Sequence, residues 1–119
     1  MKKYKSKLEQ KVAKLLGGKA EYEAEKIPFR QPEKERKYIP DWKLRENVYI
    51  ETKGRLTFED RQKHIWIKEQ HPEITIFFLF GKADNKIAKN SPTTYAMWCE
   101  NNGFDWADIK DGIPERWFE

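Results

Sequence analysis

Hydrophobic and polar residues alternate along the stretch that runs from residue 48 to residue 53. One set of alternate positions holds Val48, Ile50 and Thr52, and the other holds Tyr49, Glu51 and Lys53. This period of two predicts a β-strand with Glu51 and Lys53 on the same face. A second short strand is predicted over residues 38–42. A turn at Arg45-Glu46-Asn47 would join the two strands and bring Asp41 close to that face.

Apolar residues at helical spacing predict a first helix over residues 6–16, and they are Leu8, Val12, Leu15 and Leu16. Ser6 and Glu9 have the spacing of a capping box, and Gly17-Gly18 would end the helix. Glu9 therefore has a local structural role as a cap partner. The same residue also borders the apolar stripe, so it could face inward towards a metal ion.

Two further helices are predicted from their start signals. Thr57 is the expected N-cap of a helix that reaches residue 70, with acidic residues in its first turn. Ser91 is the expected N-cap of a third helix, because Pro92 would then occupy the first helical position. Within the predicted helical and connecting segments, His64 and His71 have no partner at a useful spacing and are interpreted as polar surface or boundary residues.

Three other segments complete the predicted order. Residues 74–80 form a nearly continuous apolar run, which predicts a strand buried on both faces. Residues 21–29 alternate imperfectly and are also interpreted as a strand. Residues 33–37 are all charged, which indicates an exposed, extended connector.

Length and charge restrict the class of protein. A chain of 119 residues suggests one domain, and 24 Lys plus Arg against 20 Asp plus Glu leave a net charge of +4, which suits a polyanionic partner. Five Trp, five Tyr and seven Phe argue against disorder. The single Cys99 excludes an intrachain disulfide and a Cys-based zinc site. The basic start, with Lys2 and Lys3, precedes no apolar run, so we expect neither a secretory signal nor a membrane partner.

Asp41, Glu51 and Lys53 are the strongest candidates for chemistry. The two carboxylates offer the hard oxygen ligands that Mg²⁺ binds, and Lys53 could polarise a water or stabilise charge on a phosphoryl oxygen. Pro40-Asp41 followed by Glu51-x-Lys53 resembles the PD-(D/E)XK signature of metal-dependent nucleases. This pattern is short, and a solvated strand face with a cross-strand ion pair explains it equally well.

Longer runs resemble the endonuclease I of T-odd podophages, a family that resolves four-way DNA junctions. In the family's order, they are Ser6-x-Leu8-Glu9-x-Lys11-Val12, Glu21-Tyr22-Glu23, Tyr38-x-Pro40-Asp41, Glu51-Thr52-Lys53-Gly54, Asp60-Arg61-x-Lys63-His64, Glu69-Gln70-His71-Pro72-Glu73 and Ser91-Pro92-Thr93-x-Tyr95. The resemblance favours an active-site role for Asp41, Glu51 and Lys53. Compared with the family, the turn at residues 17–20 is shorter, and the basic C-terminal extension has no counterpart.

The resemblance implies an α/β fold with a mixed central β-sheet flanked by helices, similar to PD-(D/E)XK nucleases. It also implies a domain-swapped homodimer with exchanged N-terminal segments. Within one nuclease domain of residues 1–119, we expect residues 1–29 to be the exchanged segment. Residues 30–37 would be the bridge between subunits and residues 38–119 the catalytic core. The charged character of the connector agrees with a bridge.

The resemblance also implies the residues of the active site. The family's acidic residues correspond to Glu9, Asp41 and Glu51, and its motif lysine corresponds to Lys53. Two ions of Mg²⁺ or Mn²⁺ are expected in each site. Asp41, Glu51 and the backbone carbonyl of Thr52 would hold one, and Asp41 and Glu9 the other. Lys53 would orient the attacking water or help to deprotonate it.

The expected function is therefore structure-selective cleavage of branched DNA, above all of four-way (Holliday) junctions, in the cytoplasm of the infected bacterial host. Phosphate contacts are expected from Lys5, Lys7, Lys11, Lys82, Lys86 and Lys89. Two alternatives stay open. One is a PD-(D/E)XK nuclease that acts on linear or sequence-defined DNA, and the other is a DNA-binding module without catalysis.

Overall fold

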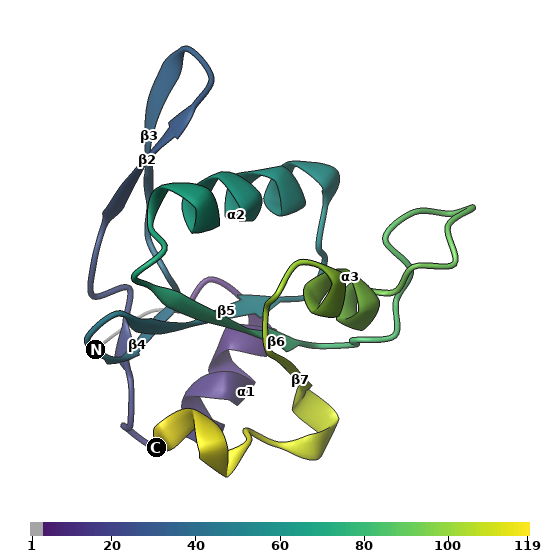
Figure 1. The fold of residues 1–119 in the computed structure, drawn as a ribbon. Coiled ribbons are helices and arrows are strands. Elements are labelled where there is room, and N and C mark those ends of the chain that lie inside the picture. Colours follow the sequence, from purple (N-terminus) through teal and green to yellow (C-terminus); the bar gives the residue numbers. More distant parts are fainter. Residues whose placement is uncertain (1–3) are drawn as a thin grey trace.

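The computed structural model describes residues 4–119. Its elements in chain order are α1 (Lys7–Leu16), β1 (Glu21–Tyr22), β2 (Ile27–Gln31), β3 (Lys34–Tyr38), β4 (Trp42–Arg45), β5 (Val48–Lys53), α2 (Phe58–Gln70), β6 (Thr75–Phe80), α3 (Tyr95–Asn101) and β7 (Trp106–Asp108), followed by the short 3-10 helices Ile109–Asp111 and Glu115–Phe118. Figure 1 shows a central sheet with helices on both of its faces. The predicted mixed α/β fold is thus confirmed.

The main sheet has the strand order β1-β4-β5-β6-β7. β1, β4 and β5 pair antiparallel, whereas β5, β6 and β7 pair parallel. Helix α2 makes the crossover between β5 and β6, as a parallel pair requires. Lys53 is paired with Phe80 at the shared carboxyl end of these two strands, so the chain leaves both strands at one edge of the sheet.

Each face of the sheet buries its own core. On one face, Phe78 and Phe80 pack with residues of α2 and α3, including Ile67 and Trp98. On the other face, Ile50 and Leu79 pack with α1 and with Trp117 near the C-terminus. In Figure 1, α1 and the C-terminal turn lie across the sheet from α2 and α3. β6 is therefore hydrophobic on both sides, as the apolar run of residues 74–80 predicts.

The local signals set the ends of the first two helices. The Ser6 hydroxyl accepts the backbone N–H of Glu9 at 3.1 Å, and Gly17 ends α1 with a φ of 55°. Thr57 and Asp60 form a reciprocal capping box at the start of α2. The predicted N-cap Ser91 of the third helix is wrong, because α3 begins after Thr94. The Ser91 hydroxyl instead accepts the N–H of Thr93 in a turn, at 3.1 Å.

Residues 21–38 differ from the prediction. The expected strand over residues 21–29 is divided into β1 and β2, and the charged connector forms β3, which pairs antiparallel with β2. The two strands meet at Pro32 and Glu33, and Glu33 has a φ of 66°. The hairpin projects beyond the sheet and lies against the C-terminal part of α2 (Figure 1), where Gln70 binds the backbone of Arg30. The connector is exposed as expected, but it is paired rather than irregular.

His64 is fully buried, so its interpretation as a surface or boundary residue is wrong. Its ring lies edge-on to Tyr38 and Phe78, and neither ring nitrogen has a hydrogen-bond partner among the described residues. Burial lowers the pKa of His64 well below its ordinary value, with the charges of Lys53 and Lys63 acting in the same direction. The ring is therefore neutral and acts as part of the core. His71, by contrast, is partly exposed and binds the carbonyl of Pro28.

Within residues 4–119, none of the helices combines the length and the apolar content that crossing a bilayer demands.

Candidate active site

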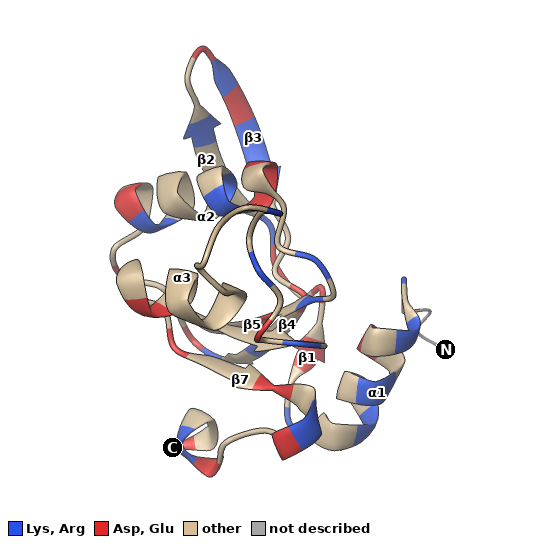
Figure 2. Cartoon of the chain, turned by 90° about the vertical axis from the view of Figure 1, so that its right-hand side faces the viewer, with Lys and Arg blue, Asp and Glu red and all other residues tan. Residues whose placement is uncertain are grey.

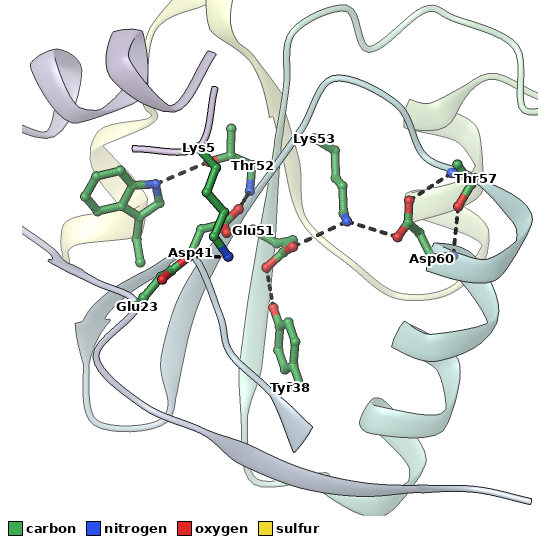
Figure 3. A network of polar contacts seen from close by, with 10 residues as sticks. Lys5, Glu23, Tyr38, Asp41, Glu51, Thr52, Lys53, Thr57 and Asp60 are labelled. Carbon is green, nitrogen blue, oxygen red and sulfur yellow. Dashed lines mark hydrogen bonds and ion pairs between the residues drawn. The ribbon is translucent and has the colours of Figure 1, made fainter. Parts of the chain in front are cut away.

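The alternation of β5 directs Glu51 and Lys53 towards the start of α2. The Lys53 ammonium lies 3.4 Å from a carboxylate oxygen of Glu51 and 3.1 Å from one of Asp60 (Figure 3). Burial alone would lower the pKa of Lys53, but the two carboxylates outweigh this effect and raise it. Lys53 is consequently a protonated, nearly immobile positive charge at the edge of the sheet.

Glu51 is held from its other side by Tyr38. The Tyr38 hydroxyl donates to a Glu51 oxygen at 2.6 Å, and both side chains are buried. Burial and the neighbouring Glu51 raise the pKa of Tyr38 well above its ordinary value, so this phenol stays protonated and remains a donor. Lys53 and Tyr38 together fix the orientation of the Glu51 carboxylate (Figure 3).

Asp41 lies between β3 and β4 rather than within the strand predicted for residues 38–42. Its carboxylate accepts the backbone N–H of Thr52 at 2.8 Å. Burial raises the pKa of Asp41 from 3.8 to about 8, and the negative charges of Glu51 and Glu9 add to the rise, while the Thr52 N–H opposes it. Asp41 and Glu51 thus form a buried acidic pair, and the positive charge nearby does not fully compensate for its burial and negative charge.

Glu9 reaches the same region from α1. Its carboxylate accepts the Tyr22 hydroxyl at 2.7 Å and the backbone N–H of Lys5 at 2.8 Å. The capping role is therefore present only in part, because the Ser6 hydroxyl binds the N–H of Glu9, whereas the Glu9 carboxylate is turned away to other donors. Its carboxylate is close enough to Asp41 to affect the pKa of that group.

The acidic residues provide the donor set for a hard divalent cation. Among residues 4–119, no three His, Cys, Asp or Glu side chains stand close enough together to form a ready-made metal site. The buried Asp41–Glu51 pair nevertheless suits such an ion, because a bound cation would offset both the burial and the negative charge of Glu51 that raise the pKa of Asp41. Thr52 follows Glu51 on β5, and its hydroxyl accepts the indole N–H of Trp42 at 3.3 Å.

Two residues of the cluster were missed from the sequence. From the sequence, Asp60 is only one of the acidic residues in the first turn of the helix that Thr57 caps. Tyr38 was placed in a strand without a role. A sequence signal for either contact is lacking, since Lys53–Asp60 and Tyr38–Glu51 both depend on how α2 and the hairpin pack on β5.

The predicted DNA-binding lysines fall into two groups. Lys7 and Lys11 are exposed on α1, and Lys5 beside them pairs with Glu23 at 2.9 Å. The other three, Lys82, Lys86 and Lys89, are exposed in the loop that follows β6. This loop starts beside the cluster, because the Gly81 N–H donates to the Lys53 carbonyl. Figure 2 shows further basic residues along α1 and the β2–β3 hairpin, while Lys2 and Lys3 lie outside the described residues.

The whole chain is similar to phage nucleases. A family model described as phage endonuclease I matches residues 1–119. Endodeoxyribonuclease 1 of Enterobacteria phage T3 is 44% identical over 108 residues, which cover 88% of this chain and 71% of the relative. Endonuclease I of Escherichia phage T7 is 41% identical over 119 residues, covering 98% of this chain and 78% of the relative. The matched residues include those of the sheet, the hairpin and both flanking layers of helices.

Proposed function

The chain belongs to the phage endonuclease I family and is a nuclease, and from this premise we propose that it resolves four-way junctions and other branched DNA by metal-dependent phosphodiester hydrolysis. The observation that carries the proposal is the group formed by buried Asp41 and Glu51 with the half-buried Lys53 at one edge of the sheet. Its members come from the PD-(D/E)XK pattern, and the relatives named above are DNA-cleaving enzymes by name.

Each acidic residue has a proposed role towards divalent metal. Asp41, Glu51 and the Thr52 carbonyl would hold one Mg²⁺ or Mn²⁺, and Asp41 with Glu9 would hold a second. When bound, the ions supply Lewis-acid stabilisation of the attacking and leaving oxygens. Tyr38 keeps the Glu51 carboxylate in a fixed orientation, which favours binding because less order must be created when the ion arrives.

Lys53 contributes a fixed positive charge rather than a base. Its raised pKa keeps the ammonium protonated at neutral pH, so it serves to orient water and to offset negative charge on the phosphoryl oxygens. Of the two roles expected from the sequence, the electrostatic one is therefore favoured. Asp60 holds this charge in place from α2.

We propose that the active dimer exchanges residues 1–29 through an opened β2–β3 hairpin. In the closed chain, Glu33 adopts the left-handed region, which costs a residue other than glycine roughly 1–2 kcal/mol. Opening the turn relieves this strain, while β2 can pair with β3 of a second chain in the same register. Each site would then combine Glu9 of one chain with Asp41, Glu51 and Lys53 of the other. The chain would act in the cytoplasm of the infected host.

The pKa of Asp41 predicts how metal affinity depends on pH. Since burial and like charge raise that pKa to about 8, the carboxyl is protonated below about pH 8 and must lose its proton to bind metal. The Kd for Mn²⁺ should therefore rise up to about tenfold for each pH unit below 8 and level off above it. Titration calorimetry without DNA measures this. Asp41→Asn should bind weakly and lose the pH dependence, and a wild-type Kd that is constant between about pH 6 and 8 would contradict the role of Asp41.

Cleavage of a four-way junction should be much faster than cleavage of a linear duplex with the same sequence. The reason is that two sites held at a fixed separation and angle can engage two strands of a branch together. A time course with both substrates, in Mg²⁺ and at equal concentration, tests this. Equal rates on both would instead support a nuclease of linear DNA, and tight binding without any cleavage would support the non-catalytic alternative.

A further inference from the structure

A cavity of about 500 Å³ lies between α2 and the β2–β3 hairpin. Its lining includes three aromatic rings, two amides and two cations, which belong to Phe29, Phe58, Trp66, Gln31, Gln62, Arg36 and Lys63. Asp60 lines it as well, and the same carboxylate binds Lys53. The cavity and the candidate active site therefore share a wall.

Phe58 is the most exposed large apolar side chain in the described part of the molecule, with 69% of its surface accessible. It is the first residue of α2, whose start is fixed by the capping box of Thr57 and Asp60. The Arg61 guanidinium lies 5.7 Å from the ring centre, a cation–π arrangement that restrains the ring without burying it. Phe58 thus presents an aromatic surface to solvent beside the residue that holds Lys53.

Lys63 connects the other side of the cavity to Glu51. Its ammonium lies 5.2 Å from the centre of the Tyr38 ring, and the Tyr38 hydroxyl donates to Glu51. A ligand that fills the cavity would therefore touch neighbours of two active-site residues, Lys53 through Asp60 and Glu51 through Tyr38. The cavity is therefore close enough to the candidate active site for one substrate to occupy both.

We propose that this cavity binds one unstacked nucleobase of the DNA strand being cut, with Phe58 as the stacking surface and Lys63 beside a neighbouring phosphate. The inference rests on the proposed function and specifies how that site recognises its substrate. A base offers a flat π-face to the rings, a hydrogen-bonding edge to Gln62 and an anionic backbone to Arg36 and Lys63. The volume is within the range of roughly 300–1,000 Å³ that is usual for small-ligand sites.

A nucleobase explains the lining better than backbone phosphate does. Backbone phosphates need only exposed cations, such as the lysines after β6, and would gain nothing from three aromatic rings. Unstacking costs least for a base that is mismatched, damaged or already single-stranded, so this mode of binding favours irregular DNA over a regular duplex. Exchange of residues 1–29 would preserve the cavity, since β2 of the second chain would supply the same contacts.

The test measures equilibrium binding of junctions by gel shift in EDTA, so that cleavage does not enter the readout. The proteins are wild type, Phe58→Ala, Phe58→Trp and the control Leu15→Ala, which truncates another exposed apolar side chain on α1. The substrates are one intact four-way junction and a series in which single nucleotides around the cut site are made abasic. Thermal unfolding of each variant checks the fold.

We expect Phe58→Ala to weaken binding of the intact junction by about 5- to 150-fold, the equivalent of stacking one base. Phe58→Trp and Leu15→Ala should stay near wild type. At one abasic position, wild type and Phe58→Ala should bind equally, because the base that Phe58 contacts is missing. The inference would be overturned if Phe58→Ala weakened binding by the same factor at every abasic position. It would also be overturned if Phe58→Ala bound the intact junction as tightly as wild type does. If the wild-type protein binds the junction but does not cleave it in Mg²⁺, the proposed function alone is refuted. If the wild-type protein binds no junction, the proposed function and the base-binding inference are both refuted.

Discussion

Replacing Lys53 with alanine should reduce junction cleavage by about a hundred- to a thousand-fold and leave junction binding nearly unchanged. Lys53 is half-buried between Glu51 and Asp60, and both carboxylates keep it protonated. Its charge is thus held where we propose that charge develops during the reaction, whereas the exposed lysines after β6 and on α1 are the residues expected to contact the DNA backbone. A cleavage time course beside a gel shift in EDTA separates the two effects.

Lys43→Ala is a matched control for this experiment. Lys43 also pairs with two carboxylates, those of Glu25 and Glu46, but it lies on β4 opposite Tyr49 rather than at the carboxyl end of β5. Its loss should leave the cleavage rate close to wild type. Near-normal cleavage by Lys53→Ala, or an equal loss in both variants, would contradict the electrostatic role given to Lys53.

Mixed dimers should recover cleavage from two inactive parents if residues 1–29 are exchanged. Glu9→Ala and Asp41→Ala homodimers should each be inactive, because every site lacks one acidic ligand. When the two chains form one exchanged dimer, one site collects both substitutions and the other has none. The mixed dimer should then nick a supercoiled cruciform plasmid without linearising it, a change from no cutting to one working site of two.

A second mixed dimer gives the control. Asp41 and Glu51 belong to the same predicted catalytic core, so a dimer of Asp41→Ala with Glu51→Ala has one defect in each site whether or not α1 is exchanged. It should remain inactive. If the Glu9→Ala and Asp41→Ala pair is equally inactive in both Mg²⁺ and Mn²⁺, then Glu9 acts within its own chain, where α1 of the closed form places it, or serves only in the helix cap.

Much of the site is visible in the sequence because it depends on local periodicity. The alternation along β5 is sufficient to predict that Glu51 and Lys53 share a face, and their separation of 3.4 Å confirms it. The caps at Ser6 and Thr57 follow from contacts within four residues. The resemblance to a nuclease family was needed for Glu9, whose capping pattern offers a complete explanation without any chemistry.

The wrong predictions share a cause, because in each of them tertiary contacts overrode the local sequence signal. At the third helix, the Ile87 N–H binds the Thr93 carbonyl and Lys86 forms a bridge with Thr94, so residues before α3 are held extended and Ser91 cannot cap it. β3 has charged residues on both faces, and its pairing with β2 leaves no hydrophobic pattern to detect. His64 looks polar in sequence but faces the sheet, as Ile67 does one turn later.

The proposed nuclease site is tested most directly by asking whether the purified protein cuts a four-way DNA junction only when a divalent ion is present. We predict cutting in Mg²⁺ or Mn²⁺, loss of cutting when EDTA is added, and recovery when the ion is restored in excess. Cutting at the same rate in EDTA, or a junction that is bound but left intact in both ions, would contradict the assignment of Asp41, Glu51 and Lys53 as a metal-dependent nuclease site.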